Sequence, residues 1–123
     1  MNKIAHRGNT QGRKVDMEND PYYIFDALKE GHYCEVDVWF KNGHYYLGHD
    51  APQYPTDLDF LENDKLFCHA KNIEAFHEML KYPKINCFWH DQDECALTSH
   101  LFVWKYPEVY SKGKLWGICS DWL

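Results

Sequence analysis

The sequence predicts a single domain of the α/β class that spans residues 1–123. Runs rich in β-branched and aromatic residues alternate with segments of helical periodicity through the first two thirds of the chain. The 123 residues are a normal length for one domain, and 45% hydrophobic residues are enough for one core. The sequence shows no internal repeat, low-complexity stretch or linker that would divide it.

The first half of the sequence predicts a strand, a helix and a hairpin, in that order. Strands are expected at residues 3–7, 33–40 and 44–47. Asn19 and Asp20 offer a helix N-cap and Pro21 suits the first helical turn, which predicts a helix of about ten residues that ends at Gly31. Asn42-Gly43 between the last two strands is a strong hairpin signal.

The second half is expected to contain four more strands, at residues 66–71, 85–89, 101–106 and 115–120. Residues 57–61 are compatible with one helical turn. Asn72 is expected to cap a helix in which Ile73, Phe76 and Leu80 share one face. The connections after residue 90 are too short for full crossover helices.

Polar residues stand at the ends of the strands predicted in the first half. They are His6-Arg7-Gly8, Glu35-Val36-Asp37 and His49-Asp50. Because residues i and i+2 of a strand project to one face, Glu35 and Asp37 point the same way. Two adjacent carboxylates repel unless a cation lies between them, and carboxylate oxygens suit Mg²⁺ or Ca²⁺. The alternative is a solvated pair of carboxylates on an exposed strand.

Four short motifs in this order resemble the glycerophosphodiester phosphodiesterases, members of the phospholipase-C-like phosphodiesterase superfamily. The motifs are His6-Arg7-Gly8, Glu18-Asn19, Glu35-Val36-Asp37 and Leu47-Gly48-His49-Asp50, and the strong part of the resemblance covers residues 3–50. Weaker similarity continues at residues 66–71 and 117–121. The resemblance implies a (β/α)₈ barrel, which needs about 250 residues. We therefore expect a reduced or incomplete TIM-type (β/α) barrel of about five to seven strands, or one completed by a second copy of the chain.

The resemblance also implies the chemistry. It suggests a metal-dependent hydrolase of a glycerophosphodiester-like or related small phosphodiester, with Mg²⁺ or Ca²⁺ bound by Glu35 and Asp37. Arg7 would hold the phosphate, and His6 and His49 would share the proton transfers without an assignment of acid and base. The attacking hydroxyl would give a cyclic phosphate, which water then opens.

Position 69 departs from the pattern of that family, because His69 stands where a third metal carboxylate is expected. His69 is therefore either a metal ligand or a neutral replacement, and Lys71 on the same strand would offer a positive charge to phosphate. His90-Asp91 and Asp93-Glu94 follow another strand and are either part of the same rim or ordinary loop residues. The alternative to an enzyme is a degenerate, non-catalytic module that binds phosphate and metal; a fragment of a longer enzyme is a third possibility.

Composition narrows the class of partner. A net charge of -6 with no basic tract argues against nucleic acid. No apolar run reaches the roughly 18 residues of a membrane span and no signal peptide is recognised, so a cytoplasmic location is expected. The chain has five cysteines, and Cys34, Cys68 and Cys119 fall inside predicted strands without CxxC spacing, so they are expected to be reduced core residues and not disulfides or zinc ligands. Apolar surface left uncovered by a reduced barrel would favour a homo-oligomer.

Overall fold

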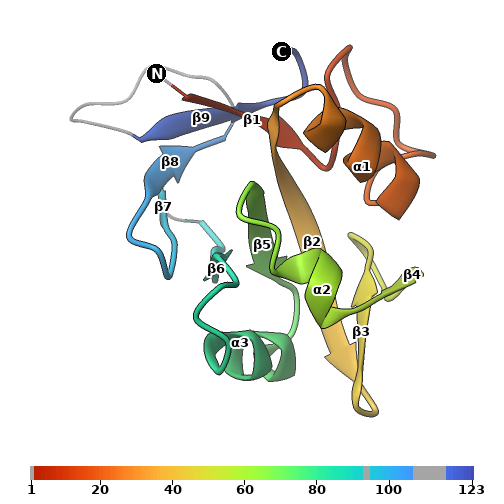
Figure 1. Ribbon diagram of the computed structural model, residues 1–123, viewed down its shortest axis with the longest axis vertical. Coiled ribbons are helices and arrows are strands. Elements are labelled where there is room, and N and C mark those ends of the chain that lie inside the picture. Colours follow the sequence, from red (N-terminus) through yellow and green to blue (C-terminus); the bar gives the residue numbers. More distant parts are fainter. Residues whose placement is uncertain (1, 93–94, 107–115) are drawn as a thin grey trace.

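Figure 1 shows the computed structural model of the protein, which describes residues 2–92, 95–106 and 116–123. Its helices are α1 (Pro21–Lys29), α2 (Leu58–Leu61) and α3 (Ile73–Leu80). Its strands are β1 (Asn2–His6), β2 (Tyr33–Lys41), β3 (His44–Leu47), β4 (Tyr54–Thr56), β5 (Leu66–Ala70), β6 (Cys87–Phe88), β7 (Ala96–Leu97), β8 (Val103–Lys105) and β9 (Gly117–Ser120).

Local sequence signals explain the helices and the hairpin. The side chain of Asp20 accepts a hydrogen bond from the Tyr22 amide and so caps α1, and Pro21 occupies its first position. Asn72 caps α3 in the same way. Asn42 and Gly43 both have positive φ angles, 52° and 79°, as a tight hairpin between β2 and β3 requires. The predictions made from these signals are confirmed.

All nine described strands belong to one mixed sheet. The strands β6, β5, β2, β1, β9 and β8 run parallel in that spatial order, whereas β7 pairs antiparallel with β8. The long strand β2 pairs with β5 along one edge, and its other edge is shared by β1 and then by the antiparallel β3, which in turn pairs with β4. This sharing brings the end of β3 close to the end of β1.

The predicted reduced (β/α) barrel is wrong. A (β/α) barrel needs a helix after each parallel strand, but the described residues form a mixed sheet of nine strands with three helices. The hairpin at Asn42-Gly43 adds two antiparallel strands, and no helix lies between β6 and β9 among the residues described. The strands β4 and β7 were not predicted; both are very short, and their pairing depends on distant neighbours.

The core lies on both faces of the sheet. On one face, alternate strand residues such as Ala5, Cys34 and Val36 pack against the helices through Ile24 of α1 and Met79 of α3. Figure 1 shows α1 and α3 near opposite ends of the long strand β2. These helices cover the face of the sheet that does not carry Glu35 and Asp37.

A second, aromatic cluster lies on the other face. It consists of Ile4, Phe67, Phe88, Ala96, Trp104 and Cys119. The ring of Trp104 in β8 lies 5.7 Å from that of Phe67 in β5 and 5.0 Å from that of Phe88 in β6. Since β8 is not hydrogen-bonded to β5 or β6, the sheet must curve around this cluster. The polar residues described below lie at one end of it.

The structure also bears on the predictions about the cysteines and about membrane-spanning segments. Cys34, Cys68 and Cys119 are buried, as predicted for core residues, and so is Cys87, whereas Cys95 is exposed. Among the described residues, no helix combines the length and the apolarity that a bilayer crossing requires.

Candidate functional site

Strand register brings four of the predicted site residues together on one face of the sheet. His6 at the end of β1 is the register partner of Glu35 in β2, and His69 in β5 is the register partner of Asp37. Glu35 and Asp37 point to the same side because they are two residues apart. The four side chains therefore form one row across β1, β2 and β5.

Glu35, Asp37 and His69 form a compact cluster of possible metal ligands. One donor atom from each lies within 4.8 Å of the others. Nδ1 of His69 is 3.3 Å from Oδ1 of Asp37 and 3.7 Å from Oε2 of Glu35. The carboxylates are 3% and 1% exposed, yet Oε1 of Glu35 and Oδ1 of Asp37 have no hydrogen-bond partner among the described residues. Unpaired buried oxygens next to an imidazole nitrogen suit a cation.

The imidazole of His69 is fixed from two sides. Its Nε2 lies 3.2 Å from the backbone carbonyl oxygen of His90, and its ring stacks on Phe88 with centroids 4.8 Å apart. Burial lowers the pKa of His69, but contacts with Asp37 and Glu35 outweigh burial and raise that pKa to about 9. Without a metal, the ring is therefore an imidazolium at neutral pH.

Arg7 follows β1 and joins three parts of the site. Its Nε lies 3.1 Å from Oδ2 of Asp37, one terminal nitrogen donates to Glu18 at 3.0 Å, and the other donates to Nδ1 of His49 at 2.7 Å. His49 reaches this position because β3 runs antiparallel along the same edge of β2 that β1 occupies. Arg7 adopts a left-handed φ of 54°, which turns the chain at the end of β1.

Asn19 holds Asp37 in place with two hydrogen bonds. Its amide nitrogen donates to Oδ2 of Asp37 at 2.9 Å, and its carbonyl oxygen accepts from the Asp37 backbone N–H at 2.9 Å. Burial would raise the pKa of Asp37, but contacts with His49, His69 and Arg7, together with the Asn19 hydrogen bond, hold that pKa well below its usual range. Asp37 is therefore ionised.

His6 is oriented by a carboxylate from the other end of the chain. Its Nδ1 lies 2.9 Å from Oδ1 of Asp121, and Nε2 lies 3.9 Å from Oε1 of Glu35. Tyr106 stacks on the ring with centroids 3.9 Å apart and donates its hydroxyl to Oδ2 of Asp121 at 2.9 Å. Because a carboxylate accepts, we assign the proton to Nδ1, and Nε2 of His6 is free to accept a proton.

Glu18 is the centre of a buried network beside these residues. It accepts hydrogen bonds from Arg7 and Arg13 and one at 2.8 Å from Asn9, which also donates to Asp121 at 2.9 Å. Burial opposes ionisation of Glu18, but these hydrogen bonds and the charge of Arg7 lower its pKa to about 2. The network links the carboxylate that orients His6 with the carboxylate that holds Arg7.

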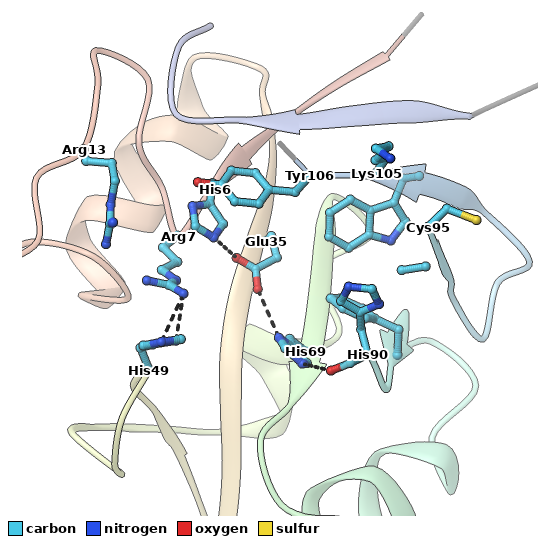
Figure 2. Close-up of a pocket in the computed structure, with 13 residues that line it drawn as sticks. His6, Arg7, Arg13, Glu35, His49, His69, His90, Cys95, Lys105 and Tyr106 are labelled. Carbon is cyan, nitrogen blue, oxygen red and sulfur yellow. Dashed lines mark hydrogen bonds and ion pairs between the residues drawn. The ribbon is translucent and has the colours of Figure 1, made fainter. Parts of the chain in front are cut away.

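The row of polar residues opens into a cavity of about 340 Å³ (Figure 2). Arg7, Arg13 and Lys105 contribute positive charges to its wall, whereas Glu35 is its single carboxylate among the described residues. Phe88, Trp104 and Ala96 form an apolar part of the wall. Although the whole chain has a net charge of -6, this cavity suits an anionic ligand with an apolar or neutral portion.

The structure brings together His6, Arg7, Glu35, Asp37, His49 and His69, all of which the sequence singled out. Lys71 follows the end of β5 and is not among the residues that line the cavity. His90 lines the cavity, while Asp91 is exposed; Asp93 and Glu94 lie outside the described residues.

Sequence reasoning missed the supporting residues Asn9, Asn19, Tyr106 and Asp121 as members of the site. Glu18-Asn19 belongs to one of the motifs and Asp121 ends a predicted strand, so both positions carried a signal. Nothing in the local pattern pairs Asp121 with His6 or Asn9. These contacts depend on the parallel pairing of β1 with β9.

Comparison of the chain with models of protein families, with curated proteins and with solved structures gives no match in any of the three. A function is therefore inferred from the chemistry of the site.

Proposed function

We propose that this protein is a metal-dependent phosphodiester hydrolase that acts on a glycerophosphodiester-like or related small phosphodiester. The observation that carries the proposal is that one guanidinium, one carboxylate and three imidazoles line a single cavity, and that buried Asp37 completes a cluster with Glu35 and His69 beside it. The groups that line the cavity are Arg7, Glu35, His6, His49 and His69. Each group has a separate task in the cleavage of a phosphate ester. The sequence resemblance described above points to the same chemistry.

The residues present fit a divalent metal ion. Oδ1 of Asp37 is buried without a hydrogen-bond partner beside Nδ1 of His69, and Oε2 of Glu35 lies 3.7 Å from the same nitrogen, so a bound cation would satisfy these groups. Glu35, Asp37 and His69 would hold it. When bound, the metal would neutralise charge on the phosphate and lower the pKa of a hydroxyl beside it.

Arg7 is positioned to bind a phosphate oxygen at the wall of the cavity. Its guanidinium is planar and carries several donors, which suits recognition of phosphate. Asp37 and Glu18 hold two of its nitrogens at 3.1 and 3.0 Å. The terminal nitrogen that contacts His49 belongs to the more exposed side of the site, so phosphate can approach it by displacing or sharing this contact.

His6 and His49 supply the proton transfers. Nε2 of His6 carries a lone pair, because Nδ1 donates to Asp121, so it accepts the proton of the attacking hydroxyl as the new P–O bond forms. His49 can act as an acid only as the imidazolium, with a proton on each ring nitrogen, so its contact with Arg7 must give way when phosphate binds. Nδ1 would then face Oδ2 of Asp37, which lies 3.6 Å away, and Nε2 would donate its proton to the leaving oxygen as the old P–O bond breaks. We therefore assign His6 as the base and His49 as the acid, and the two exchange roles when water opens the cyclic phosphate.

A non-catalytic module that binds phosphate and metal is the second candidate. The observation that favours it is the engagement of Arg7, whose guanidinium is already in contact with Glu18, Asp37 and His49. An arginine held in this way contributes positive potential while three of its five N–H donors are already engaged. In such a module, His6 would need no orientation by Asp121.

The test measures release of the alcohol from a glycerophosphodiester by the full chain with Mg²⁺, Ca²⁺ or Mn²⁺ and with EDTA. His6→Gln removes the base and is expected to lower kcat by about 10² or more. His44→Gln is the matched control, since His44 is an exposed histidine at the start of β3, outside the cavity. Binding of the phosphodiester without its hydrolysis would establish the second candidate. If the chain neither binds nor hydrolyses the phosphodiester, both candidates are rejected.

A further inference from the structure

We propose that Nδ1 of His69 is a metal ligand, and that the resulting nitrogen and oxygen donor set selects a first-row transition-metal ion such as Mn²⁺ or Zn²⁺ over Mg²⁺ and Ca²⁺. The inference rests on the metal site of the proposed function and deepens it. It assigns the chemical class of the metal from the residues of this chain.

The hydrogen bond to the backbone fixes which nitrogen of His69 can bind a metal. A carbonyl oxygen accepts hydrogen bonds and cannot donate them, so Nε2, at 3.2 Å from the carbonyl oxygen of His90, carries the hydrogen. The lone pair of the neutral ring is then on Nδ1. Such a contact behind a metal-binding imidazole fixes both its tautomer and its direction. Stacking on Phe88 restricts the remaining rotation of the ring.

The free lone pair of His69 points toward the two carboxylates. Figure 2 shows the His69 ring facing Glu35 from the opposite side of the cavity to Arg7. Nδ1 lies 3.3 Å from Oδ1 of Asp37 and 3.7 Å from Oε2 of Glu35. Without a metal, a proton on Nδ1 lies between the ring and the two carboxylates; a divalent cation would take the place of that proton between the three groups.

The two oxygens of Asp37 have different partners, which leaves one of them for the metal. Oδ2 accepts from Asn19 at 2.9 Å and lies 3.1 Å from Nε of Arg7. Oδ1 faces His69 and has no hydrogen-bond partner among the described residues, although the Asp37 side chain is 1% exposed. Oε1 of Glu35 is unpaired in the same way. That oxygen lies on the side of His6, at 3.9 Å from its Nε2, whereas Oε2 of Glu35 lies on the side of His69.

The donor set decides which ions bind well. Ca²⁺ takes six to eight oxygen ligands and Mg²⁺ prefers an octahedron of oxygens, so an imidazole nitrogen at the third position suits neither. Imidazole suits Zn²⁺, Fe²⁺ and the other later first-row ions best, and affinity for nitrogen and oxygen sites rises from Mn²⁺, the weakest of the series, along the Irving–Williams order. With three donors from the protein, the remaining positions are open to water and phosphate oxygens, as in catalytic zinc sites.

The test measures ion affinities by titration calorimetry and nitrogen coordination by pulsed EPR of the Mn²⁺-loaded full chain. His69→Glu replaces the nitrogen with carboxylate oxygens. His77→Glu introduces the same charge at an exposed histidine of α3 and is the matched control. His69→Asn provides a second variant if His69→Glu fails to fold.

The wild-type chain is expected to bind Mn²⁺ and Zn²⁺ at least about tenfold more tightly than Mg²⁺ and Ca²⁺. Its Mn²⁺ spectrum should show ¹⁴N coupling, which both His69 variants lose and His77→Glu retains. His69→Glu should also lower the ratio of Mn²⁺ to Mg²⁺ affinity by about tenfold.

Three results would overturn the inference. Tight binding without ¹⁴N coupling would show that His69 is not a ligand, and equal affinity for Ca²⁺ and Mn²⁺ would remove the selectivity; both leave the proposed hydrolase standing. Absence of binding for all four ions would remove the site itself. Hydrolysis of a glycerophosphodiester is then measured in EDTA: activity that persists would replace the metal-dependent hydrolase with a metal-independent one, and no activity would remove the proposed hydrolase as well.

Discussion

Nδ1 of His6 lies 2.9 Å from Oδ1 of Asp121, although 115 residues separate the two in the sequence. Asp121 also accepts from Asn9 and Tyr106, so its two oxygens are held by three side chains. This arrangement gives His6 one tautomer and provides a negative charge to stabilise the imidazolium that forms when His6 accepts a proton.

Replacing Asp121 is therefore expected to impair catalysis more than substrate binding. Asp121→Asn keeps the shape of the side chain but removes its charge and allows the amide to favour the wrong tautomer of His6. We expect kcat for glycerophosphodiester hydrolysis to fall by about 10², with little change in KM. Asp64→Asn, in the exposed turn before β5, is the control and should leave both constants unchanged. Equal rates for wild type and Asp121→Asn would rule out the orienting role.

Glu18 is expected to make the stability of the protein sensitive to acid. Its pKa in the folded chain is about 2, below the ordinary value of 4.5, so the folded state binds the proton more weakly than the unfolded state. Its contribution to the free energy of unfolding is complete above pH 4.5 and is lost as the pH falls toward 2. The contribution at neutral pH is on the order of 3 kcal/mol.

Urea unfolding between pH 2 and 7 measures this contribution. Glu18→Gln should lower the free energy of unfolding near neutral pH and flatten its dependence on pH below about 4.5. Glu62→Gln, at the C-terminal end of α2 and outside the cavity, should keep the slope of the wild type. If the slopes of Glu18→Gln and wild type coincide, the Glu18 network does not stabilise the fold.

Asn19 contributes to stability through its contacts and through its backbone conformation. It has a left-handed φ of 68°, and both polar atoms of its side chain bond to Asp37. Asn19→Ala should lower the free energy of unfolding by about 3 kcal/mol, because it removes both hydrogen bonds and places a β-carbon in this conformation without a compensating contact. Asn19→Gly should be about 1 kcal/mol less harmful, since glycine accepts positive φ. Thermal and urea unfolding of the two variants separates these effects.

Divalent metal is expected to stabilise the wild-type fold. A ligand that binds only the folded state adds about 2.7 kcal/mol at a hundredfold excess over Kd, which corresponds to several degrees in Tm. Asp37→Asn should abolish this gain. In EDTA the variant should also be less stable than wild type by about 3 kcal/mol, because Asp37 balances the charge of Arg7 and of His69.

Calorimetry measures the Tm of the wild type and of Asp37→Asn, each with EDTA and with Mn²⁺. A pair of isolated like charges would give the opposite result in EDTA, since loss of one carboxylate would then relieve repulsion. An unchanged Tm of the wild type at millimolar Mn²⁺ would mean that Glu35, Asp37 and His69 do not form a working metal site.

Local patterns predicted most of the elements, whereas long-range pairing escaped them. The caps at Asp20 and Asn72 and the turn at Asn42-Gly43 depend on neighbouring residues, so α1, α3 and the β2–β3 hairpin were predicted within a few positions. The strands β4 and β7 contain three and two residues and owe their existence to their partners. The barrel was expected from a resemblance concentrated in residues 3–50, but β3 and β4 pair antiparallel and no helix lies between β6 and β9 among the described residues.

In the site, too, local patterns predicted some residues, whereas others depend on long-range strand pairing. Alternation along β2 predicted that Glu35 and Asp37 share a face, and strand ends predicted the positions of His6 and His49. The position of Asp121 beside His6 depends on the pairing of β1 with β9, and no short sequence pattern predicts that pairing. A homo-oligomeric state and a cytoplasmic location stay predictions.

The pairing of β1 with β9 also has a consequence for the order of folding. It closes a loop of more than a hundred residues, because Asn2 pairs with Gly117, and such closure costs about 4 kcal/mol of chain entropy. During synthesis β1, β2 and β5 emerge well before β9, so one edge of β1 stays open while the metal ligands can already assemble. Open strand edges invite pairing with other chains. The nascent protein is thus open to misassembly at β1, and the step that closes this edge is the same one that gives His6 its carboxylate.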